Sequence, residues 1–327
     1  MTRQFTVAHE SWPIAGSFTI SRGTKTSAEV VTVTLEDDGA TGRGECVPYP
    51  RYGETVEAVK AALERARPAI EAGMTRRDIP GVLDLRAARN AVDCALWDLE
   101  AKKSGTPVWQ LAGLPPPQPT VTAYTLSLDT PHAMAEAARN SCNRPLLKLK
   151  LGDEGDAERL RAIRAAAPSA RLIIDANEGW QPQDLEKLFS VCEETGVELI
   201  EQPLPAGNDD ALRDIAHPVM VCADESAHDR AGLNDLIGKY DAINIKLDKT
   251  GGLTEMLATA EAAREAGLDI MIGCMLATSL AMAPALIAAA NASFVDLDGP
   301  LLLARDRQPG ITFDGSIMQP PPTALWG

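Results

Sequence analysis

The sequence predicts an α/β protein, a modified TIM-type (β/α)7β barrel with an N-terminal α+β capping domain. Eight short apolar segments follow one another from residue 120 onward, and amphipathic helical segments lie between them. This alternation is typical of a closed β/α barrel. The first 115 residues instead alternate like antiparallel strands and then like helices. Nearly every barrel segment also ends in a charged residue, as expected at the mouth of such a barrel.

The capping domain is expected to contain antiparallel strands followed by two amphipathic helices. The strands are expected within residues 5–23 and 27–46, with "EDDG" as a hairpin turn, and the helices at 54–73 and 85–105. The second helix is expected to stop at its final glycine, Gly105.

A proline-rich stretch, "LAGLPPPQPT", separates this domain from the barrel. We expect the capping domain at residues 1–115, the catalytic barrel at 116–300, and a C-terminal tail at 301–327 that returns to the cap. Pro300 and no clear helix follow the last barrel strand, so the final repeat is expected to be degenerate. The eight barrel strands are expected at 121–128, 146–152, 171–177, 198–203, 219–226, 242–248, 269–274 and 293–299.

Composition narrows the classes of partner. A formal net charge of −15 argues against nucleic acid or an anionic membrane surface, because both select for clustered Lys and Arg. The six cysteines show no C-x-x-C pair and the N-terminus has no apolar signal core, which favours a cytoplasmic protein with free thiols. The uncharged run between Asp269 and Asp296 divides into a short strand and an Ala-rich helix rather than forming a membrane span. The sequence does not define the oligomeric state, and a homo-oligomer is compatible with it.

Two lysines occupy one face of the second barrel strand, in "LLKLKLG". Side chains alternate along a strand, so Lys148 and Lys150 point one way and the leucines point the other. Two solvated lysines on an edge strand would be the ordinary interpretation of such a pattern. The charges at the ends of the other strands favour a site inside the barrel mouth instead.

Three acidic residues end three consecutive strands: Asp175, Glu201 and Asp224. Their spacings of 26 residues (175 to 201) and 23 residues (201 to 224) each equal one β/α step, so the carboxylates should stand side by side. Three such groups would repel one another strongly unless a cation lay among them. Oxygen ligands suit Mg²⁺, whereas the histidines and cysteines lack zinc-site spacing.

Lys150 and Lys246 should lie on opposite sides of this carboxylate row. A partly desolvated lysine near other cations is expected to have a lowered pKa and to act as a base. Two opposed bases beside a metal-bound carboxylate would permit inversion of an α-carbon through an enolate intermediate. Lys148 is then expected to neutralise the substrate carboxylate.

The motifs "KLK", "DAN", "IEQP", "ADES" and "NIKLDKTGG", in this order, give the chain a close resemblance to the enolase superfamily, in its muconate-lactonising-enzyme-like branch. Within that branch it resembles the dipeptide epimerases, particularly the L-Ala-D/L-Glu epimerases. The resemblance implies Mg²⁺ bound by the three carboxylates, Lys150 and Lys246 as the acid/base pair, and a small dipeptide substrate. It further implies that Asp296 and Asp298 in "DLDGP" bind the α-ammonium group and that Arg22 in "ISRG" binds a glutamate side chain. It also suggests a role in cell-wall peptide recycling.

Other activities on the same scaffold remain open. N-succinylamino acid racemase, o-succinylbenzoate synthase and cycloisomerase substrates have no free α-ammonium group, which Asp296 and Asp298 argue against. A sugar-acid dehydratase would need a histidine at the end of strand seven, where Cys274 stands. A non-catalytic binding barrel is the distant alternative. Arg43 stands where relatives often carry an aromatic residue, with an effect on the pocket that the sequence does not define.

Overall fold

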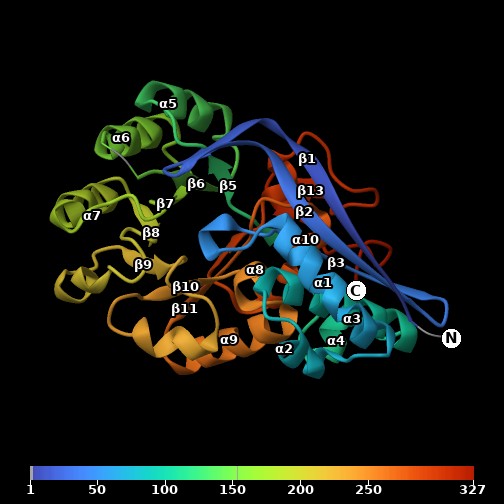
Figure 1. The fold of residues 1–327 in the computed structure, drawn as a ribbon. Coiled ribbons are helices and arrows are strands. Elements are labelled where there is room, and N and C mark those ends of the chain that lie inside the picture. Colours follow the sequence, from blue (N-terminus) through green and yellow to red (C-terminus); the bar gives the residue numbers. More distant parts are fainter. Residues whose placement is uncertain (1–2, 153) are drawn as a thin grey trace.

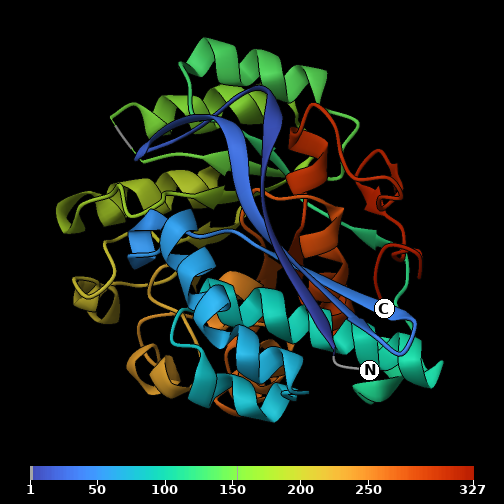
Figure 2. The same cartoon turned by 45° about the vertical axis from the view of Figure 1, so that its right-hand side comes forward.

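The computed structural model describes residues 3–152 and 154–327 and contains the predicted barrel (Figures 1 and 2). Its eight strands are parallel and follow one another in sequence order around the ring. A hydrogen bond of 2.8 Å from the Ala123 N–H to the Val295 carbonyl joins the two ends. The strands are β5 Tyr124–Leu126, β6 Leu146–Lys150, β7 Arg171–Asp175, β8 Val197–Glu201, β9 Met220–Ala223, β10 Ala242–Ile245, β11 Asp269–Gly273 and β12 Phe294–Asp296. The fold class and the presence of all eight strands are confirmed, although each strand ends earlier than expected and Val121 belongs to β4 of a separate sheet.

Helices cover the outside of the ring, though unevenly (Figure 1). Short 3₁₀ helices, Asp210–Asp214 and Arg230–Asp235, replace α-helices after β8 and β9. After the last strand the four-residue α11 stands in the place of a full-length helix, so the final repeat is degenerate, as expected. The helices of the barrel are α5 Pro131–Asn140, α6 Asp156–Ala166, α7 Leu185–Glu194, α8 Leu247–Thr250, α9 Leu253–Glu265, α10 Ser279–Ala288 and α11 Gly299–Leu302. In the described part of the chain, no helix has the length and apolar character needed to cross a bilayer.

The barrel interior is divided into an apolar floor and a charged upper layer. One buried cluster forms the floor, with inward-facing residues such as Leu146, Ile173 and Leu199. Because side chains alternate with a period of two, the inward residues two and four positions further along are those at the mouth. Lys148 and Lys150 therefore lie above Leu146. Leu147 and Leu149 point outward and belong to a different buried cluster, beneath the helices. The floor thus fixes the register that brings the charges together.

The capping domain consists of a three-stranded antiparallel sheet and helices packed on it. Its sheet contains β1 Gln4–Ile20, β2 Gly23–Asp37 and β3 Ala40–Cys46, and its helices are α1 Val56–Glu71, α2 Ile79–Val82, α3 Arg86–Ser104 and α4 Val108–Leu111. The predicted "EDDG" turn is present, with Asp38 and Gly39 at positive φ. On β3, a Cβ added at Gly44 would lie 2.1 Å from the Ala91 carbonyl oxygen of α3. Only glycine permits this close strand–helix contact.

The tail contacts both the barrel and the cap. Strand β13 Phe313–Asp314 pairs with β14 Ile317–Met318, which in turn pairs with β4 Thr120–Val121 at the start of the barrel. Near the C-terminus, buried Trp326 donates a hydrogen bond of 3.0 Å to the Cys94 carbonyl of α3. Arg43 of the cap donates to the Ala324 and Leu325 carbonyls, both at 2.7 Å, and does not line the cavity at the barrel mouth that contains Lys150 and Lys246. Arg43 thus holds the tail on the cap.

The domain boundaries at 115 and 300 stay predictions.

A buried carboxyl between cap and barrel is expected to make stability depend on pH. Asp248 accepts hydrogen bonds from the Val47 N–H and Asn90 Nδ2, and burial raises its pKa to about 7. Since the folded protein binds this proton more tightly than the unfolded chain, the contribution of Asp248 to stability falls as pH rises from about 4 to 7. Between about pH 4 and pH 7, we expect the free energy of unfolding of Asp248→Asn to rise by about 2–4 kcal/mol relative to that of the parent protein.

Urea unfolding at several pH values measures this difference. The same substitution at the exposed Asp214 is the control and should leave the pH dependence unchanged. A constant offset between Asp248→Asn and the parent protein at all pH values would contradict the prediction.

Candidate active site

The structure brings every predicted site residue of the barrel to one mouth. All are buried, and each except Lys148, which lies in the middle of β6, ends or follows a strand at its carboxyl end. They are Lys148 and Lys150 on β6, Asp175 on β7, Glu201 on β8, Asp224 after β9, Lys246 after β10, and Asp296 and Asp298 at and after the end of β12. The strands carrying Lys150 and Lys246 are separated by β7, β8 and β9 in the ring, so the two lysines flank the carboxylate row.

The three carboxylates form one compact group. One oxygen of each lies within 4.8 Å of one from each of the others. One oxygen of each carboxylate is held by a donor of the scaffold: Asp175 Oδ1 by the Asn177 N–H at 2.9 Å, Glu201 Oε1 by Asn244 Nδ2 at 2.6 Å, and Asp224 Oδ1 by Lys249 Nζ at 2.5 Å. The other oxygen of each faces a lysine of the mouth: Asp175 Oδ2 faces Lys150 at 2.6 Å, Glu201 Oε2 faces Lys148 at 2.6 Å, and Asp224 Oδ2 faces Lys246 at 2.7 Å. Each carboxylate therefore has one oxygen held by the scaffold and one oxygen paired with a lysine of the mouth.

The pKa shifts follow from this pairing. Burial raises the pKa of Asp175, but the ammonium groups of Lys150 and Lys148 outweigh burial and bring it down to about 2. Burial and the charge of Asp175 raise the pKa of Glu201 to about 7. Burial lowers the pKa of Lys246, but Asp224 and Glu201 outweigh it and raise the pKa well above its usual value. The expected lowering of the pKa is thus wrong for Lys246, because its nearest neighbours are anions rather than cations.

The donor set fits a divalent cation of the Mg²⁺ type. Asp175, Glu201 and Asp224 offer oxygen ligands only, which Mg²⁺ prefers. Each oxygen on the side of the mouth is now neutralised by a lysine rather than by a scaffold donor. A bound divalent cation would compete for these oxygens and release the lysine amines toward the cavity. The arrangement therefore satisfies the ligand chemistry that the sequence predicted.

Asp296 and Asp298 border a small recess of about 40 Å³ beside the lysines. Asp296 Oδ2 lies 2.7 Å from Lys148 Nζ, whereas its buried Oδ1 has no hydrogen-bond partner among the described residues. Asp298 accepts a hydrogen bond of 2.7 Å from the Thr125 N–H, and burial and Asp296 raise its pKa to about 7. The recess thus has an unsatisfied acceptor ready for a donor of a bound molecule.

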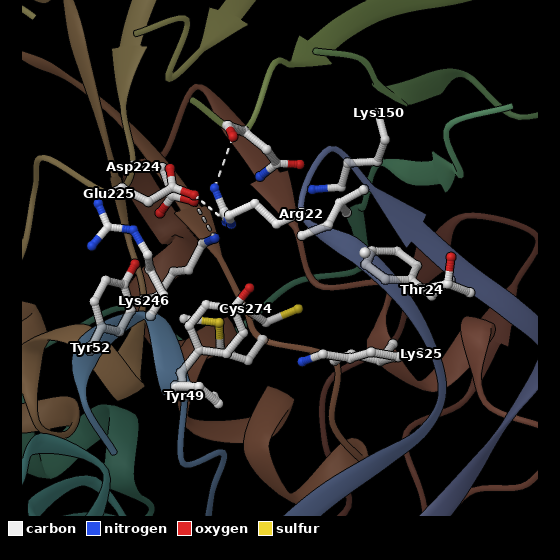
Figure 3. A pocket seen from close by; sticks show the side chains of 18 residues that line it. Arg22, Thr24, Lys25, Tyr49, Tyr52, Lys150, Asp224, Glu225, Lys246 and Cys274 are labelled. Carbon is white, nitrogen blue, oxygen red and sulfur yellow. Dashed lines mark hydrogen bonds and ion pairs between the residues drawn. The ribbon is translucent and has the colours of Figure 1, made fainter. Parts of the chain in front are cut away.

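A larger cavity of about 490 Å³ is lined by Asp224 and Glu225 among other residues (Figure 3). Its walls include Lys150, Lys246 and Cys274 from the barrel and Arg22 from the tip of the β1–β2 hairpin. Arg22 donates to the Asn177 carbonyl and Glu178 on one side, at 2.8 and 3.0 Å, and to Glu225 on the other, at 2.6 Å. The hairpin tip is therefore fastened to the barrel mouth at the cavity that Arg22 was expected to serve.

Several residues of this site were missed by the sequence interpretation. Lys249 is fully buried and holds the inner oxygen of Asp224, and Asn244 holds that of Glu201. The second lysine of "NIKLDKTGG" and an inward-facing asparagine two positions before Lys246 were the signals available. Glu178 and Glu225 were not assigned because nothing in the local pattern shows that they meet a guanidinium from the cap.

The sequence matches the models of two protein-family domains. Residues 2–113 match the model of the mandelate racemase/muconate lactonizing enzyme N-terminal domain, and residues 133–319 match that of the enolase C-terminal domain-like family. The chain belongs to the mandelate racemase/muconate lactonizing enzyme family. This family assignment confirms the predicted resemblance to the enolase superfamily.

Individual relatives narrow the comparison within the family. An L-Ala-D/L-Glu epimerase from Escherichia coli is 46% identical over 313 residues, which cover 95% of this chain and 98% of the relative. An N-acetyl-D-glutamate racemase from Pseudoalteromonas is 42% identical over 91% of this chain and 95% of its own length. Both names describe isomerases that act on amino acid derivatives.

Solved structures of related proteins superpose closely on this chain. An enolase family member from Agrobacterium tumefaciens with homology to dipeptide epimerases, bound to sodium and L-Ala-L-Glu, superposes with a TM-score of 0.97 at 55% identity, covering 99% of this chain and 100% of the other. A dipeptide epimerase from Enterococcus faecalis, complexed with Mg and L-Leu-L-Tyr, superposes with a TM-score of 0.90 at 30% identity, covering 98% and 97%. Metal and dipeptide thus occur together in structures that share this fold.

Proposed function

We propose that this protein is a Mg²⁺-dependent dipeptide epimerase that prefers L-Ala-D/L-Glu and inverts the α-carbon of the C-terminal residue. The observation that carries the proposal is the placement of Lys150 and Lys246 on opposite sides of the Asp175–Glu201–Asp224 row. Inversion needs one group to remove a proton from one face and another to return a proton to the opposite face. The relatives named above support this assignment.

The reaction then divides among the residues of the mouth. Lys150 or Lys246, whichever faces the α-hydrogen, takes the proton, and the other amine donates a proton to the resulting enolate from the opposite side. Lys148 balances the substrate carboxylate. Mg²⁺ bound by the three carboxylates would supply positive charge at that carboxylate and make the α-hydrogen more acidic.

The two ends of the substrate are assigned to different parts of the cavity. The unsatisfied Oδ1 of Asp296, with Asp298 beside it, suits the α-ammonium group of the first residue. Arg22 lines the larger cavity and suits the side-chain carboxylate of a second-position glutamate. The free thiols of all six cysteines support a cytoplasmic location for this enzyme.

Hydrogen exchange in D₂O tests the proposal. The protein is incubated with Mg²⁺ and L-Ala-L-Glu, and the products are followed by NMR and by chiral analysis. We expect deuterium at the α-carbon of glutamate and formation of L-Ala-D-Glu. Absence of exchange with every dipeptide offered would overturn the proposal.

N-acetylglutamate is the second candidate substrate, because a relative 42% identical to this chain is named for it. It lacks the ammonium group that Asp296 and Asp298 would bind. We therefore expect its racemisation to be much slower than epimerisation of L-Ala-L-Glu under the same conditions. Faster turnover of N-acetylglutamate would make it the principal substrate.

A further inference from the structure

The cap contributes cations to the cavity wall, but most of their charge is already balanced. Arg22 contacts Glu178 and Glu225, and Arg51 makes a two-pronged contact with Glu178 at 2.7 and 2.8 Å. Two guanidinium groups thus face two carboxylates, so this cluster has no net charge. A carboxylate that entered beside Arg22 would leave the cluster with a net negative charge.

Lys25 is the cation of this wall whose charge is not balanced in the described structure. It lies in β2, three residues after Arg22, is exposed, and lines the same cavity. Its ammonium group lies 4.8 Å from the centre of the Tyr49 ring, another residue of the wall (Figure 3). Among residues 3–152 and 154–327, no carboxylate forms an ion pair with it. The ring holds the ammonium by a cation–π contact, which leaves its hydrogen-bond donors available.

We propose that Lys25 determines specificity for an acidic side chain at the second position of the dipeptide. This inference rests on the proposed epimerase function. Arg22, fixed by Glu178 and Glu225, orients the side-chain carboxylate with its remaining N–H groups, and Lys25 supplies the charge that neutralises it. A neutral side chain gains nothing from Lys25, so the residue selects glutamate over glutamine.

The test compares L-Ala-L-Glu with its neutral isostere L-Ala-L-Gln in the full-length, Mg²⁺-loaded protein. For Lys25→Met, we expect kcat/KM for L-Ala-L-Glu to fall about 10- to 100-fold, mainly through KM, because a charge-assisted contact to bound substrate is lost. The value for L-Ala-L-Gln should change by less than about threefold. Lys25→Arg should retain the preference for glutamate. Higher salt should raise KM for L-Ala-L-Glu more in the parent than in Lys25→Met.

Lys187→Met, which removes a lysine exposed on α7, is the matched control and should leave both substrates unaffected. Equal changes for both dipeptides, or none for either, would overturn the role of Lys25 while leaving the epimerase function standing. If the parent protein exchanges the α-hydrogen of neither dipeptide, the proposed function fails and the specificity role fails with it.

Discussion

Substitution of either Lys150 or Lys246 by methionine is expected to abolish epimerisation of L-Ala-L-Glu, with a loss of at least about 10³-fold in kcat. Each lysine pairs with a different end of the carboxylate row, Lys150 with Asp175 and Lys246 with Asp224. Neither amine can therefore take over the proton transfer on the face served by the other. Methionine keeps most of the volume of the lysine stem but can neither accept nor donate a proton.

The stereochemistry of residual exchange makes this prediction sharper. In D₂O, one variant should exchange the α-hydrogen of L-Ala-L-Glu only, and the other that of L-Ala-D-Glu only, because each retains one base. NMR detects the exchange, and the Mg²⁺-dependent rise in the unfolding temperature shows that the variants still fold. Epimerisation within tenfold of the parent rate in either variant, or exchange of the same stereoisomer by both, would contradict the two-lysine mechanism.

Loss of the metal is expected to be as damaging as loss of a base. Glu201 is the middle carboxylate of the row and contacts Lys148 and Asn244. Glu201→Gln removes one negative ligand from the site, so we expect weaker Mg²⁺ binding and a loss of at least about 10³-fold in kcat/KM. In the parent protein, EDTA should abolish activity and added Mg²⁺ should restore it.

Thermal unfolding with and without Mg²⁺ measures binding independently of turnover. The metal should raise the unfolding temperature of the parent, because it binds the folded state, and should have little effect on Glu201→Gln. Glu198→Gln is a matched control on the same strand, since Glu198 pairs with Arg171 outside the mouth. Full activity of the parent after exhaustive chelation would disprove the requirement for a metal.

The positions of the carboxylate row and of Lys150 and Lys246 were predictable because they depend on strand periodicity. Once the eight strands were recognised, alternation fixed which side chains point inward, and the strand ends fixed which of those reach the mouth. Lys148 and Lys150 follow from Leu146 by steps of two, and the structure places all three inside the barrel. The shorter helices after β8 and β9 were not foreseen, because helical periodicity in the neighbouring repeats was extended to the whole ring.

By itself, then, the sequence determined the barrel, the order of its charged strand ends and the chemistry those groups favour. Only the tertiary structure decided how those charges are balanced: that Lys249 and Asn244 hold the row, that Arg22 meets Glu178 and Glu225, and that Arg43 holds the tail. The physical reason is the separation along the chain of the residues that interact. Alternation acts between neighbouring residues, whereas these contacts join groups far apart in the chain, and their partners are set by how the barrel strands, the cap and the tail pack on one another.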